Sequence, residues 1–103
     1  MLSDITGFVW DEGNYAKCQK HGVSIEEIEY LFQTNPLLVA DLKHSLDEER
    51  FFAIGKSCKG RHLFVVFTLV EEQAGTRIRP LSVRYMHRKE IERYEQETTD
   101  LPQ

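Results

Sequence analysis

The side chains best suited to handle a phosphate group are gathered in residues 77–93. Arg77, Arg79 and Arg84 stand in an apolar, alternating run, and the guanidinium fork of arginine matches the oxygens of a phosphate. Strand alternation places Arg77 and Arg79 on one face and Arg84 on the other, unless a bend at Pro80 re-aims it. We therefore assign anion binding to Arg79 and Arg84. Three later cations are expected to be solvated helix positions: Arg88, Lys89 and Arg93.

A second cationic point lies near the end of a predicted short helix and consists of Lys17, Lys20 and His21. The imidazole of His21 is suited to accept or donate a proton near neutral pH. Cations at this position also interact favourably with the helix dipole and with unpaired carbonyl groups. Both a chemical role and a structural role for His21 and Lys20 therefore stay open.

Cleavage of RNA without a metal ion is a reaction that such residues can support. RNA supplies its own nucleophile, the 2′-hydroxyl, so an enzyme needs a proton acceptor, cations for the transition state and a proton donor. The chain has no phosphate-binding glycine loop, dinucleotide fingerprint, zinc-protease motif or serine elbow. Its cysteines, Cys18 and Cys58, form no CxxC pair, and its four histidines lack ligand spacing. We expect no metal site and no cofactor.

The charge distribution is compatible with a polyanionic ligand despite a net charge of −4. Residues 1–55 carry −6, residues 56–93 carry +5 and residues 94–103 carry −3, which together give −4. Such asymmetry indicates a polyanionic ligand or a charged partner, although a solvated surface also explains it. The charges alone leave these alternatives open.

Two short helices are expected in the first third of the chain. The first runs from Tyr15 to His21 and is ended by Gly22, the usual residue for a left-handed stop. Ser24 and Glu27 have the spacing of a capping box, and apolar residues then recur at helical intervals for about two turns. Asn35-Pro36 ends this second helix.

The rest of the chain is expected to form strands and one more helix. A short strand over Phe8 to Asp11 precedes the helices. Phe64 to Phe67 is apolar on both faces, so its strand is expected to be central and covered by helices on at least one side. Pro80 indicates an edge position or a bulge. Four later strands are joined by short connections, which favour antiparallel hairpins: Leu37 to Ala40, Arg50 to Gly55, His62 to Val70 and Thr76 to Tyr85.

The pattern predicts an α+β fold, with an antiparallel sheet of about four to five strands, two N-terminal helices and one C-terminal helix. The C-terminal helix is expected over His87 to Gln96, with Ile91 and Tyr94 facing inward. A chain of 103 residues can bury one core, so we expect a single domain over residues 1–97 and a short tail over residues 98–103. It has no membrane-length apolar run and no signal-peptide pattern, so we expect a cytoplasmic protein without membrane contacts.

Short motifs in a fixed order make the chain resemble the BrnT family. They cover nearly the whole chain: Trp10-Asp11 with Asn14 and Lys17, the block Lys20-His21-Gly22-Val23-Ser24 with Glu27, Arg50-Phe51 with Ile54-Gly55, and Arg77 to Ser82 through Arg84-Tyr85-Met86 with Tyr94 and Glu95. Val83, where we expect Ala, and a longer loop over Glu71 to Thr76 are mild departures.

The resemblance implies a toxin of a bacterial type II toxin–antitoxin pair with a compact RelE-like fold. Such a toxin cleaves RNA without a metal, through attack of the 2′-hydroxyl on the adjacent phosphate. The implied partner is a BrnA-like ribbon-helix-helix antitoxin, which forms an oligomer with the toxin and alone contacts operator DNA. We assign catalysis to four residues: Arg79, Arg84, His21 and Lys20. We assign RNA binding to five: Lys17, Arg50, Arg61, Arg77 and Tyr94.

Two functions from different classes fit these observations. One is an endoribonuclease in which the strand arginines hold the scissile phosphate. The other is a non-enzymatic module, a degenerate toxin that pairs with an antitoxin and takes part in operon repression. The acidic first half of the chain would suit a basic partner arm, which favours the second.

Overall fold

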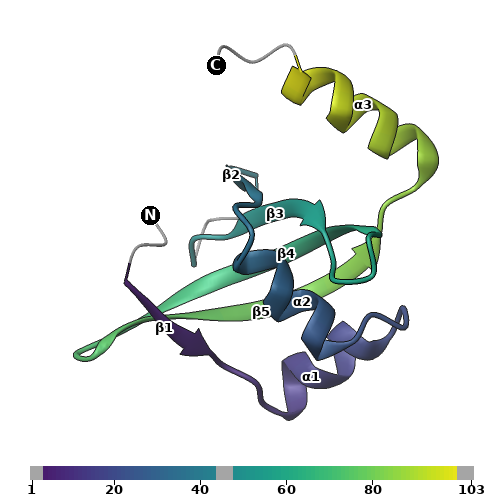
Figure 1. Ribbon diagram of the computed structural model, residues 1–103. Helices are drawn as coiled ribbons and strands as arrows, with labels where there is room; N and C mark the ends of the chain where they lie inside the picture. Colours follow the sequence, from purple (N-terminus) through teal and green to yellow (C-terminus); the bar gives the residue numbers. More distant parts are fainter. Residues whose placement is uncertain (1–3, 44–47, 100–103) are drawn as a thin grey trace.

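The computed structural model describes residues 4–43 and 48–99 as an α+β fold (Figure 1). The elements in chain order are β1 (Ile5–Phe8), α1 (Glu12–Gln19), α2 (Ile25–Phe32), β2 (Leu37–Ala40), β3 (Phe51–Lys56), β4 (His62–Glu72), β5 (Gly75–Tyr85) and α3 (Arg88–Thr99). The strands form one five-stranded sheet in the order β1-β5-β4-β3-β2. The predicted combination of sheet, two early helices and one late helix is confirmed.

The sheet is mixed, whereas the sequence predicted only antiparallel pairs. Strands β2 to β5 form the expected antiparallel meander, with β4 at its centre. Strand β1 pairs in parallel with β5, with Phe8 opposite Ile78. This strand covers Ile5–Phe8, so the prediction of a strand over Phe8 to Asp11 was three residues too late. The reason is that Asp11 is already the N-cap of α1.

Side-chain caps start both N-terminal helices. In α2, the Ser24 side chain accepts from the Glu27 backbone N–H and the Glu27 side chain accepts in return, which confirms the predicted capping box. Asp11 and Asn14 form an equivalent box, so α1 starts at Glu12, three residues before the predicted Tyr15. Gly22 has a φ of 79°, the left-handed conformation expected after this helix.

Helix α2 packs against β3 and β4 on one face of the sheet, and α1 lies against β5 (Figure 1). Their buried side chains pack with those of the central strands in one apolar cluster: Cys18, Val23, Ile28, Leu31, Ala53, Leu63, Val65, Phe67, Ile78 and Val83. Gly55 is needed here, because a Cβ at that position would lie 2.7 Å from Cδ1 of Leu31. Burial also raises the pKa of the Cys18 thiol to about 11.

A β-bulge at Leu81 changes which face of the sheet the following residues occupy. Phe67 pairs with Pro80 but Val66 pairs with Ser82, so Leu81 is an extra residue on β5. The predicted irregularity at Pro80 is thus a bulge. Because of the extra residue, Arg84 occupies the same face as Arg79, as the bend was expected to allow.

Helix α3 stands away from the sheet in Figure 1. It begins one residue later than predicted and continues to Thr99, so Thr98 and Thr99 of the expected tail are helical, while residues 100–103 of that tail lie outside the described residues. Ile91 and Tyr94 are half-buried. In the described part of the chain, no helix has the length and apolar character to cross a membrane.

Candidate functional site

The strand arginines lie on the face of the sheet opposite α2, which we call the open face. Strand register places Arg79 opposite Thr68 and Arg84 opposite Phe64 on this face. Val65 and Phe67 of the same strand point the other way, into the core. The open face therefore combines arginines with half-buried apolar side chains.

A hollow of about 530 Å³ lies on the open face, and we call it the sheet hollow. This volume is within the roughly 300–1,000 Å³ that small-ligand sites usually occupy. Three groups of side chains line it: the cations Lys17, Arg50 and Arg79, the carboxylates Asp41 and Glu48, and the apolar or small residues Phe52, Phe64, Val66, Leu81 and Ser82. The fold thus brings together three predicted site residues from α1, β5 and the approach to β3.

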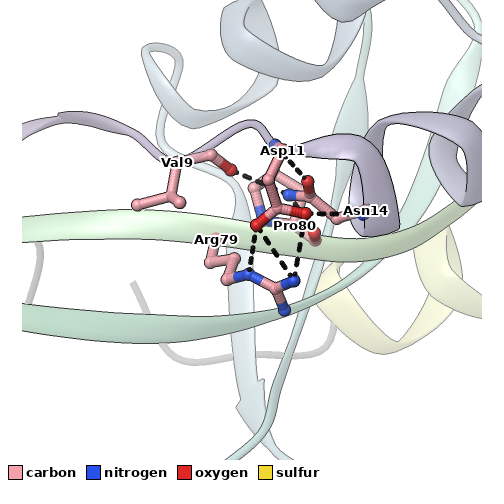
Figure 2. A network of polar contacts seen from close by, with 5 residues as sticks. All are labelled: Val9, Asp11, Asn14, Arg79 and Pro80. Atoms are coloured by element: carbon pink, nitrogen blue, oxygen red, sulfur yellow. Dashed lines mark hydrogen bonds and ion pairs between the residues drawn. The ribbon is translucent and has the colours of Figure 1, made fainter.

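The start of α1 is tied to β5 by a polar network that we call the Asp11 corner (Figure 2). The buried Asn14 amide donates to Val9 O at 2.8 Å and to Pro80 O at 2.9 Å. These two bonds join α1 to the segment that precedes it and to β5. Arg79 donates to the Asp11 carboxylate through Nε at 3.3 Å and Nη2 at 3.2 Å. Gly13 leaves room for this pair, because a Cβ there would lie 3.2 Å from Asp11 Oδ1.

The Asp11 corner leaves one edge of Arg79 available. The backbone N–H of Asn14 and the Arg79 guanidinium hold the pKa of the Asp11 carboxyl below its usual value, so it stays ionised as a partner for Arg79. The pair uses Nε and Nη2 of the guanidinium, and Nη1 has no acceptor among the described residues. Arg79 can therefore keep its carboxylate and still donate to an anion in the sheet hollow.

Arg84 is held differently, by an ion pair with Glu90 of α3 that we call the Glu90 clamp. Nη1 and Nη2 each donate to one carboxylate oxygen at 2.8 Å, a two-bond fork. Hydrogen bonds from Arg84 and from the His87 backbone N–H lower the pKa of Glu90 to about 2. The end of the guanidinium that would face a phosphate is therefore already occupied by a carboxylate.

The two remaining predicted catalytic residues, Lys20 and His21, lie at the end of α1. Lys20 is the C-cap residue, and both side chains are exposed. Neither side chain lines the sheet hollow or forms a hydrogen bond or ion pair with another described residue. Lys17 lies one turn earlier on α1 and, unlike Lys20 and His21, lines the sheet hollow.

Three further predicted RNA-binding residues lie outside the sheet hollow. Arg61 stacks its guanidinium over the ring of Tyr85, 3.5 Å from the centroid. Arg77 is on the open face but forms an ion pair with Glu72 near the β4–β5 turn. The ring of Tyr94 meets His62 edge-on at 5.7 Å, which helps to hold α3.

Sequence reasoning missed three features of this site. Asp11 was assigned to a strand, although its spacing to Asn14 is a capping signal. Its pairing with Arg79, 68 residues away, had no local signal. Phe52 lay in a run interpreted only as a strand and Phe64 in one interpreted as a central, covered strand, yet their rings line the sheet hollow with centroids 4.8 Å apart.

A comparison with protein families identifies the chain. Residues 10–90 match the model of the family described as the ribonuclease toxin, BrnT, of type II toxin–antitoxin systems. The matched region includes the sheet hollow, the Glu90 clamp and all of the Asp11 corner except Val9. A comparison with curated proteins finds no match. Type II systems pair a toxin with an antitoxin, which implies such a partner here. The chain belongs to the BrnT family of ribonuclease toxins.

Proposed function

We propose that this protein is an endoribonuclease that binds the scissile phosphate in the sheet hollow and cleaves RNA without a metal ion. One observation carries the proposal. Arg79 lines the hollow beside Lys17 and Arg50, and its Nη1 has no acceptor among the described residues. A guanidinium that is already oriented by a carboxylate costs little reorganisation when it meets the charge of a transition state.

The proposed reaction needs no group that the chain lacks. The 2′-oxygen of the substrate forms a bond to phosphorus while the bond between phosphorus and the 5′-oxygen breaks. The 2′-hydroxyl proton passes to a base. His21, the predicted residue, does not line the hollow, so it can be this base only where its exposed side chain at the end of α1 reaches the bound RNA. The ammonium group of Lys17, which lines the hollow, gives a proton to the leaving 5′-oxygen. The products are a 2′,3′-cyclic phosphate and a 5′-hydroxyl end.

Arg84 has a lesser part in this proposal than the sequence suggested. Both of its Nη groups are bonded to Glu90, so it can bind a phosphate end-on only after exchange of that carboxylate. We assign the principal phosphate contact to Arg79. The Arg84 guanidinium lies 4.9 Å from the Phe64 ring centroid and contributes charge at the edge of the hollow.

The test is cleavage of RNA by the purified full chain, freed of antitoxin, in the presence of EDTA. We expect cleavage with 2′,3′-cyclic phosphate ends, and no cleavage at a position where the 2′-hydroxyl is replaced by hydrogen. His21→Asn and Lys17→Ala, measured over a range of pH, test the two proton transfers. Lys20→Ala tests whether the neighbouring cation at the end of α1 contributes to cleavage. Absence of cleavage at micromolar protein, or unchanged cleavage by the double variant Arg79→Ala with Arg84→Ala, would contradict the assignment.

The Glu90 clamp favours a second candidate function. A toxin whose strand arginines are all paired with carboxylates fits a module that binds an antitoxin and no longer cleaves RNA. In this version a BrnA-like ribbon-helix-helix partner carries the complex to operator DNA. Growth arrest on expression without the antitoxin supports the enzyme, and harmless expression supports the module.

A further inference from the structure

We infer that Phe52 and Phe64 form a stacking surface for an unpaired nucleobase, so that the protein selects single-stranded RNA. The inference rests on the proposed function, because it concerns a second contact in the same hollow. The two rings come from neighbouring strands, β3 and β4, and their planes are tilted by 40° with centroids 4.8 Å apart. Both line the sheet hollow.

The apolar character of this face points to a ligand. A sheet that packs helices on one side usually carries polar side chains on the other. Here the positions that alternate with the core residues are Phe52, Ile54, Phe64 and Val66, all half-buried. Two aromatic rings with a guanidinium over one of them match the way proteins hold single-stranded nucleic acids.

The charges around the hollow orient the ligand. Arg79 and Ser82 lie on β5, Val66 is opposite Ser82 on β4, and Phe52 is opposite Val66 on β3. Adjacent strands are about 4.8 Å apart. Measured across the sheet, Phe64 on β4 is therefore one strand away from Arg79 on β5, and Phe52 on β3 is two strands away. Asp41 and Glu48 line the hollow as well, and their charges disfavour a phosphate beside them. The arrangement therefore suits a phosphate at Arg79 and a base over the rings.

A base in a duplex cannot take this position, because its faces are stacked on neighbouring base pairs. Recognition through an exposed ring requires that the base be splayed out of a helix, which is easy in single strands. Stacking tolerates every base, since each has a π-face. We therefore expect a strong preference for single strands over duplexes and a weak preference among the four bases.

The experiment uses the antitoxin-free full chain and an RNA oligonucleotide with 2′-O-methyl sugars, which cannot be cleaved, carrying 2-aminopurine as a fluorescent base. We expect the fluorescence to be quenched on binding, and the single strand to bind at least about tenfold more tightly than the same strand annealed to its complement. Phe52→Leu should weaken binding of the single strand by roughly five- to 150-fold, whereas Phe52→Tyr should retain it.

Phe51→Leu is the matched control. Phe51 is the preceding residue but faces the helices, where its ring stacks on Phe67 with centroids 5.5 Å apart. This variant should lower the melting temperature while the affinity for the single strand stays within about twofold of wild type. Circular dichroism of Phe52→Leu confirms that the variant used for binding is folded.

The possible results separate the inference from the proposed function. If Phe52→Leu binds as wild type does while Arg79→Ala binds weakly, the stacking surface is wrong and the ribonuclease function stands. If the wild-type protein neither binds nor cleaves any RNA, the proposed function itself fails. If Phe52→Leu loses affinity for a cognate antitoxin but keeps its affinity for RNA, the face docks a protein and the inference is overturned.

Discussion

The Asp11 corner and the Glu90 clamp use the same chemical pair, an arginine of β5 and a carboxylate, in two geometries. In the corner, Asp11 meets Arg79 from the side, through Nε and Nη2, and leaves Nη1 open. In the clamp, Glu90 meets Arg84 end-on, through both Nη groups. The first pairing leaves a guanidinium N–H group for the anion that we propose to bind there, and the second uses the end of the guanidinium. The geometry of the pair, and not the residue type, therefore distinguishes the arginine proposed to bind phosphate from the arginine that is bonded to α3.

The two regions also differ in how they are joined to the fold. Asp11 is the N-cap of α1, and Asn14 in the same capping box is 2% exposed and bonded to two backbone carbonyls. Glu90 lies on α3, which stands away from the sheet (Figure 1). We expect substitutions in the corner to change both activity and stability, and substitutions in the clamp to change mainly the position of α3.

The largest expected effect is on cleavage by Arg79→Ala. Loss of one charge-stabilising donor in a preorganised site typically lowers the rate by about 10²- to 10³-fold. Arg84→Ala should cost no more than about tenfold, because its fork is occupied by Glu90. Single-turnover cleavage measures both, with Arg88→Ala as control for an exposed arginine paired on its own helix. Equal losses for Arg79→Ala and Arg84→Ala would abolish the distinction between corner and clamp.

The next effect is on stability, through Asn14→Ala. Removing a buried amide that satisfies Val9 O and Pro80 O should lower the free energy of unfolding by about 1–3 kcal/mol. For a domain of this size that corresponds to roughly 5–20 °C in melting temperature. Gln73→Ala, in the exposed β4–β5 turn, should change the free energy of unfolding by less than about 0.5 kcal/mol. An unshifted melting curve for Asn14→Ala would show that the corner does not hold the fold.

Glu90→Gln is expected to have a smaller effect, which is a gain in RNA affinity. The substitution releases the Arg84 fork and removes a negative charge near the sheet hollow, so RNA affinity should rise by up to about fivefold, the scale of an exposed ion pair. Amide exchange in α3 should become faster, while the global melting temperature stays nearly unchanged. Glu92→Gln, which breaks only the pair with Arg88, is the control. Weaker RNA binding by Glu90→Gln would mean that the clamp positions Arg84 for its ligand.

The smallest expected effect is on the pH dependence of the clamp. The pKa of Glu90 is lowered to about 2, below its unfolded value, so the clamp stabilises α3 at pH values above the unfolded pKa. This contribution is lost as the pH falls through the folded pKa, from about 4.5 towards 2. An NMR titration of the side-chain carboxyl carbons should show Glu90 titrating well below the ordinary value of a glutamate. A Glu90 pKa at that ordinary value would contradict a two-bond clamp in solution.

Local signals in the sequence predicted most of the secondary structure. The Ser24 cap, the stop at Gly22 and the four strands of the meander all follow from patterns within a few residues. The parallel strand β1 did not, because its partner is 70 residues away and its place depends on which edge of the sheet stays open. Pro80 predicted either an edge position or a bulge. Only the pairing of β4 with β5 decides between them, and it shows a bulge.

The candidate site was predictable by residue type but not by partner. Lys17, Arg50 and Arg79 were proposed from charge and from the family resemblance, and they share one hollow. Their carboxylate neighbours could not be foreseen, since Asp11 reaches Arg79 only through the β1–β5 pairing. Phe52 and Phe64 were hidden for another reason. An apolar strand residue has the same sequence signature whether it enters a core or faces a ligand.

The parallel pairing of β1 with β5 also affects the timing of synthesis. The ribosome adds Asp11 68 residues before Arg79, which corresponds to roughly 3 to 14 seconds at about 5–20 residues per second. The corner cannot close until β5 has left the ribosome, so a nascent chain lacks the proposed phosphate site during this interval. We expect ribonuclease activity to begin only after β5 has been synthesised. An antitoxin already present in the cell then has a period in which to bind the toxin before it can act.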